Sequence, residues 1–80
     1  MTESRLTKLP VGKTARVTRI EGSGAVRQRL LEMGLVRGAS VRFVRVAPLG
    51  DPIEIQLRGS HLSLRREDAD RILVTQEAPG

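Results

Sequence analysis

Apolar and polar residues alternate along much of the chain with the period of two that half-buried β-strands show. The alternation is cleanest at Ile53, Ile55 and Leu57, with polar residues between them. Comparable segments predict further strands at residues 14–20, 40–47, 61–65 and 72–75. The chain is therefore expected to be mainly β, with about five short strands.

One predicted strand departs from strict alternation. Within residues 40–47, Val41 and Phe43 share one face, whereas Val44 and Val46 share the other. Two explanations are open: both faces are covered there, or a β-bulge shifts the register.

A single segment has helical periodicity instead. At residues 25–33, Val26, Leu30 and Met33 recur at helical spacing, and Leu31 broadens the apolar stripe. Such a short helix is not stable alone, so its apolar face is expected to dock on the sheet.

Both ends of this helix have recognisable signals. Ser23 is placed to cap the N-terminus through its hydroxyl. Gly34 follows the last periodic residue and fits a left-handed C-cap, with Leu35 folding back onto the final turn. We expect Gly34 and Gly38 to be backbone requirements and not ligand contacts.

The remaining segments complete a small fold. Residues 48–52 contain two prolines and a glycine and predict a projecting loop, and residues 66–70 predict a helical turn or a 3₁₀ piece. We expect one domain over residues 1–80, with an ordered core at about 6–75 and a tail at 76–80. The predicted architecture is a partly open, SH3-like antiparallel barrel with one inserted helix, and an OB-type barrel is the nearest competitor.

Composition excludes several classes of site. The 80 residues include no cysteine and one histidine, His61, so the supply of ligands for a transition metal, which normally needs three or four that converge, is thin. Asp68 and Asp70 lie beside Arg65, Arg66 and Arg71, which are expected to neutralise them. No nucleophile and base pair suggests itself, and the Gly12-Lys13-Thr14 run lacks the earlier glycine of a phosphate-binding loop. We expect no enzyme activity, no cofactor and no metal site.

The chain is basic, with a formal charge of +5 from 14 basic and 9 acidic residues, and 12 of the basic residues are arginine. This charge suits nucleic acid, an anionic membrane surface or an acidic protein, but it also suits a solvated sheet surface. A nucleic-acid-binding barrel is the main alternative, although Phe43 is the single aromatic residue and such barrels usually stack bases on aromatic side chains. A barrel that binds proline-rich peptides lacks an aromatic groove for the same reason.

Four motifs in order resemble the FeoA family of bacterial ferrous iron uptake over about residues 6–75. They are Leu9-Pro-Val-Gly12, Arg29-Leu-Leu-Glu-Met-Gly-Leu-Val-Arg-Gly38, Ala47-Pro-Leu-Gly-Asp-Pro52 and Leu64-Arg-Arg-Glu-Asp-Ala69. The resemblance implies an SH3-like barrel that acts from the cytoplasm on FeoB, a GTP-binding membrane transporter of ferrous iron, without being an enzyme. The same domain ends iron-dependent repressors, so a related regulatory domain is a further alternative. Because the chain begins directly at the barrel, we expect a stand-alone cytoplasmic protein without membrane insertion, and a monomer is favoured.

Two surfaces are candidates for contact with a partner. The first is the polar side of the helix, formed by Arg27, Gln28, Arg29 and Glu32, where arginines can offer several donors to an acidic partner. The second is the loop 48–52, which presents Leu49 and Asp51. The alternatives are a solvated helix face with a local ion pair between Arg29 and Glu32, and an ordinary hairpin turn.

Overall fold

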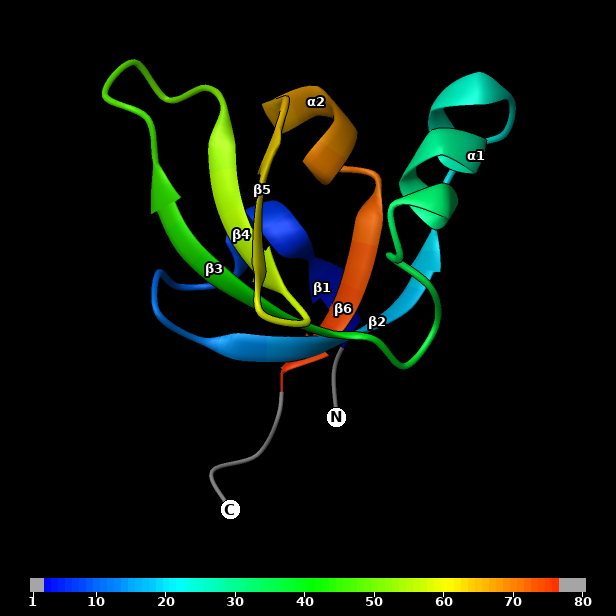
Figure 1. The fold of residues 1–80 in the computed structure, drawn as a ribbon, viewed down its shortest axis with the longest axis horizontal. Helices are drawn as coiled ribbons and strands as arrows, with labels where there is room; N and C mark the ends of the chain where they lie inside the picture. Colours follow the sequence, from blue (N-terminus) through cyan, green and yellow to red (C-terminus); the bar gives the residue numbers. More distant parts are fainter. Residues whose placement is uncertain (1–2, 77–80) are drawn as a thin grey trace.

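The computed structural model describes residues 3–76, which form one curled sheet with two helices at one end (Figure 1). The strands are β1 (Glu3–Arg5), β2 (Thr14–Ile20), β3 (Ser40–Val46), β4 (Ile53–Leu57), β5 (Ser60–Leu64) and β6 (Ile72–Gln76); the helices are α1 (Ala25–Glu32) and α2 (Arg66–Ala69), with a 3₁₀ turn at η1 (Leu6–Lys8). The expected mainly β fold, inserted helix and helical turn before the last strand are confirmed.

The sheet has the order β1-β6-β2-β3-β4-β5, and every neighbouring pair is antiparallel. Its two edge strands, β1 and β5, do not pair with each other, so the barrel is partly open. The register shifts between Phe43 and Arg45 in β3 and between Val17 and Arg19 in β2. The bulge explanation for residues 40–47 is therefore correct, and both bulges bend the sheet.

Residues 3–76 form six strands, one more than predicted. The additional strand is β1, which the sequence pattern does not predict because it is only three residues long and shows no alternation. β1 pairs with β6, and the Nη1 group of Arg5 donates to Glu21 at 2.6 Å. Glu3 accepts hydrogen bonds from Thr18 and Arg19 on β2, and these bonds lower the pKa of the Glu3 carboxyl. The carboxylate of Glu21 raises the pKa of Arg5 in turn. Hydrogen bonds and ion pairs thus hold β1 against β6 and β2.

The core is one cluster of aliphatic side chains and a single phenylalanine inside the barrel. Its members are Leu6, Leu9, Ala15, Val17, Ile20, Leu30, Leu35, Ala39, Val41, Phe43, Ile53, Ile55, Leu57, Leu64, Ala69, Ile72 and Val74. Val26, Leu31 and Met33 of the predicted helical stripe are partly buried against it, and Leu30 is fully buried. The amphipathic helix therefore docks as its periodicity predicted.

The ends of α1 confirm one predicted cap and correct the other. Gly34 has φ +104°, and the amides of Gly34 and Leu35 donate to the carbonyls of Leu31 and Leu30 at 3.0 and 3.2 Å. This pair of bonds is a Schellman C-cap. Ser23 is not the N-cap, because Gly24 occupies that position with φ +83° and no side chain caps the helix.

The predicted boundary between the core and the C-terminal tail also changes. Gln76, which was assigned to the tail, is the last residue of β6 and pairs with Ala15. The rest of the predicted tail, residues 77–80, lies outside the described residues, as do residues 1–2. The described chain therefore begins and ends on neighbouring strands, since Glu3 pairs with Thr75.

Candidate partner-binding face

The loop 48–52 is tied to the start of α2. A carboxylate oxygen of Asp51 accepts from the amide of Arg66 at 3.0 Å, and the Arg66 guanidinium donates to the carbonyl of Gly50 at 3.3 Å. Asp51 therefore supplies the first turn of α2 with the acceptor that its own N-cap, Arg65, does not provide. Leu49, at the loop tip, is 96% exposed.

The other side of α2 is tied to α1. The Nη2 group of Arg29 lies 3.4 Å from Oδ2 of Asp68, whose residue exposure is only 8%. One expectation is wrong here, and the local ion pair of one alternative is not formed. Asp68 is paired by the distant Arg29 and not by the arginines next to it in sequence, and Arg29 is held by Asp68 and not by Glu32.

The two candidate surfaces are thus joined through α2. We call the surface formed by α1, α2 and the loop 48–52 the helical face; Figure 1 shows all three segments at one end of the barrel. A hollow of about 360 Å³ lies between α1 and the β5–α2 segment, lined by residues that include Met33, Ser63 and Arg65. A second hollow of about 420 Å³ lies on the other side of α2, lined by Lys8, Asp51 and Glu67 among others.

The predicted contact residues occupy defined places on this face. Arg27, Gln28, Arg29 and Glu32 are exposed on α1, and the Gln28 amide lies 3.4 Å from the Glu32 carboxylate. Arg27 makes no ion pair or side-chain hydrogen bond within residues 3–76. Arg27 therefore presents a free guanidinium, whereas Arg29 already has a structural role.

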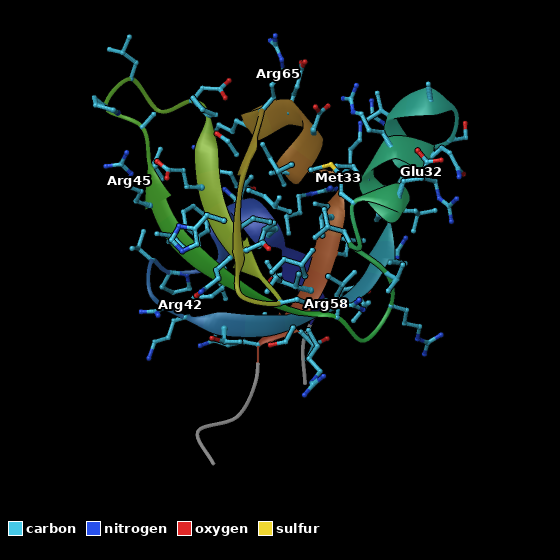
Figure 2. All side chains as sticks on the ribbon, in the orientation of Figure 1. Glu32, Met33, Arg42, Arg45, Arg58 and Arg65 are labelled. Carbon is cyan, nitrogen blue, oxygen red and sulfur yellow. The ribbon has the colours of Figure 1, made fainter. Side chains whose placement is uncertain are left out.

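Sequence reasoning missed the residues at the centre of the face. Arg65 and Glu67 are exposed on and beside α2, and Figure 2 shows Arg65 projecting from this end of the molecule and Met33 between α1 and α2. The sequence predicts that the charges within the motif Leu64–Ala69 neutralise one another, which does not single out Arg65 and Glu67 as a contact surface. The spacing of Arg65 and Glu67 on a single helical turn gives no periodic signal that would have identified them.

The described part of the chain contains no group of three or more His, Asp or Glu side chains that could hold a metal ion. His61 is exposed on β5, opposite in phase to Leu62, as expected. Within the same residues, no helix is long and apolar enough to cross a membrane.

Comparison with known proteins places this geometry in a family. The family model described as the FeoA domain matches residues 4–76. The chain belongs to the FeoA family. Over 70 residues it is 46% identical to a fusion protein of Fe(2+) transport protein A and the Fe(2+) transporter FeoB from Porphyromonas gingivalis, a match that covers 88% of this chain and 8% of the fusion protein. The chain thus spans less than a tenth of the length of that relative.

Solved structures agree with the family and the fold. FeoA from Chlorobium tepidum is 46% identical with a TM-score of 0.85, and the match covers 92% of this chain and 70% of that one. FeoA from Stenotrophomonas maltophilia, described as a prokaryotic SH3 domain protein in complex with zinc, is 32% identical with a TM-score of 0.79 and coverage of 91% and 94%. The expected SH3-like barrel is confirmed.

The similarity to metal-dependent repressors concerns the fold alone. The IdeR structure from T. acidophilum has a TM-score of 0.84 at 24% identity, covering 96% of this chain and 35% of that one. At this identity the likeness concerns the backbone arrangement alone, as it does for a manganese-dependent repressor at 17% identity.

Proposed function

We propose that this FeoA-family chain is a non-enzymatic accessory of ferrous iron uptake that binds the cytoplasmic part of a FeoB-type transporter through its helical face. The observation that carries the proposal is the relative in which FeoA and FeoB are one polypeptide. Fusion holds two domains at an effective concentration in the millimolar range, which is useful where the domains touch. In a separate chain, the contact must be provided by a surface.

The helical face supplies such a surface. It combines an almost fully exposed leucine, Leu49, with the free guanidinium of Arg27 and the exposed Arg65. Arginine is among the residue types enriched at protein interfaces, and an exposed leucine adds apolar area that a contact would bury. The ties from Asp51 and Arg29 to α2 hold the loop and the helix in a fixed arrangement, which reduces the entropy lost on binding.

The barrel interior supports an accessory and not a catalyst. Its buried side chains are apolar apart from Asp68 among the described residues. The rival role in nucleic-acid binding is not favoured, because Phe43 is the single aromatic residue of the sequence and is 2% exposed. No aromatic ring is available to stack on a base.

The test measures binding of the chain to the isolated cytoplasmic domain of the FeoB transporter from the same genome by titration calorimetry. We expect Arg27→Glu and Leu49→Asp each to weaken binding by at least about fivefold, since each places a charge that the partner surface does not match. Arg29 is left unchanged, because Arg29→Glu would set a second carboxylate against Asp68 and disturb the fold itself.

Arg37→Glu is the matched control. It makes the same change of charge at an exposed position that follows α1 and has no ion pair within the described chain. If Arg27→Glu and Leu49→Asp both bind like the original chain, the helical face is not the contact. Absence of binding by the unchanged chain would overturn the proposed function as a whole.

A further inference from the structure

A second surface feature lies at the opposite end of the barrel from the helical face. It is a hollow of about 360 Å³ on the sheet, beside the turn that joins β4 to β5, and Figure 2 shows its two arginines, Arg42 and Arg58, at this end. The lining residues are Thr14, Ser40, Arg42, Gln56, Arg58 and Gly59. Three neighbouring strands contribute residues to this hollow, because Arg42 on β3 pairs in register with Thr14 on β2 and with Gln56 on β4.

The charges of this hollow are not compensated. Arg42 and Arg58 are exposed and make no ion pair or side-chain hydrogen bond in the described part of the chain. The next arginine along β3, Arg45, is paired with Glu54. No lining residue is acidic, and the others offer hydroxyl and amide donors. The hollow therefore combines two guanidinium groups with neutral donors, and no acidic residue among residues 3–76 pairs with them.

The backbone at Arg58 gives an independent sign of function. Arg58 has φ +53° and Gly59 has φ +82°, so both central residues of the β4–β5 turn are left-handed. This turn type strongly prefers Asn-Gly or Gly-Gly, and Arg58 is the one non-glycine residue with positive φ among residues 3–76. Because the turn does not favour arginine, the backbone conformation does not account for arginine at this position.

We propose that this hollow binds a phosphate group. A carboxylate is satisfied by one guanidinium fork, whereas a phosphate has enough acceptor oxygens for two forks and the neighbouring hydroxyl and amide donors. Free phosphorylated molecules and lipid headgroups both carry this group. The site is separate from the helical face and does not depend on the contact with FeoB.

The first experiment follows backbone and arginine N–H signals by NMR while inorganic phosphate is added to the full chain, with sodium chloride at matched ionic strength as the reference. We expect saturable shifts at Arg42, Arg58 and Gly59 with phosphate alone. Arg42→Gln and Arg58→Asn should each raise the apparent dissociation constant roughly threefold to tenfold. Arg42→Lys, which keeps the charge without the fork, should fall between these variants and the original chain.

Arg45→Gln is the matched control, since it removes the same charge from β3 outside the hollow and should leave the titration unchanged. Arg58→Asn adds a second readout, because asparagine suits the left-handed turn: the variant should melt a few degrees higher while binding phosphate more weakly. A merely structural arginine would not give these opposite effects. Equal shifts with chloride, or equal loss in Arg45→Gln, would overturn the proposal.

A co-sedimentation assay separates the two sources of phosphate. Vesicles of phosphatidylcholine are compared with vesicles that also contain phosphatidylglycerol, using the original chain and the Arg42→Gln/Arg58→Asn double variant. Sedimentation that requires both phosphatidylglycerol and these arginines assigns the site to a headgroup. No sedimentation, together with saturable binding of inorganic phosphate, assigns it to a free phosphorylated molecule.

Discussion

At the scale of single residues, Gly34 shows how the chain ends helix α1 and continues toward β3. Its φ of +104° is a conformation that side chains disfavour, and a β-carbon there would lie 3.3 Å from Cδ2 of Leu57. The two Schellman hydrogen bonds place Leu35 in the core, where it is fully buried. A backbone requirement at one residue therefore fixes the docking of α1.

We expect Gly34→Ala to lower the free energy of unfolding by about 1–2 kcal/mol, measured by chemical denaturation. Gly12→Ala is the control, because Gly12 has a similar φ of +90° with nothing within 4 Å of the added carbon. The loss at Gly34 should exceed that at Gly12 by the cost of displacing Leu57. A Gly34→Ala variant as stable as the original chain would refute the cap.

Some residue-level features follow from sequence and others do not. The role of Gly34 was predictable because a glycine directly after an amphipathic helix commonly adopts the left-handed conformation that ends the helix. The pairing of Arg29 with Asp68 was not, since 39 positions separate them and the choice of partner depends on how α1 and α2 dock. Ser23 failed as a cap because Gly24 can also begin a helix and lies one residue closer to it.

At the scale of elements, β1 depends on polar contacts more than the other strands do. It is three residues long, and its anchoring includes the bonds from Thr18 and Arg19 to Glu3 and the pair of Arg5 with Glu21. Such a short strand with no buried residue of its own has little apolar area to hold it in place.

The lowered pKa of Glu3 predicts how the stability depends on pH. A carboxyl whose pKa is lower in the folded state stabilises the fold above its ordinary value of 4.5 and loses that contribution as pH falls through the folded pKa. Glu3→Gln should therefore unfold at lower denaturant concentration than the original chain at pH 7, and the two should converge in acid. Glu67→Gln removes an equal charge without breaking an ion pair of the described chain, and should show a smaller difference; a constant gap at all pH values would contradict the prediction.

The elements themselves were largely predictable, for physical reasons that differ between them. β2, β4 and α1 each bury one face, so their apolar residues recur with the period of the backbone. β1 has no such face, and α2 is a single turn, so neither gives a period. The sequence motif around α2 was visible, but its role in joining α1 to the loop 48–52 depends on contacts between distant segments.

At the scale of the whole molecule, the net charge of +5 should act on association before any contact forms. If the helical face meets an acidic surface, salt screens the attraction and slows the encounter. We expect the association rate with the FeoB cytoplasmic domain to fall on the order of tenfold between about 0.05 and 0.5 M salt, measured by stopped-flow fluorescence of a labelled partner. The Arg27→Glu variant should show a shallower dependence, and a rate that does not change with salt would exclude electrostatic attraction.

The two ends of the described chain lie together on β1 and β6, at the end of the barrel away from the helices (Figure 1). Any polypeptide that continues from β6 therefore starts on the far side from the helical face. The molecule measures 36 × 29 × 23 Å. A linker that starts at β6 therefore needs about ten extended residues before a domain attached to it can contact the helical face. In a fusion of FeoA and FeoB, the length of this linker would decide whether the FeoA domain can bind the transporter domain of its own polypeptide or only that of a neighbouring one.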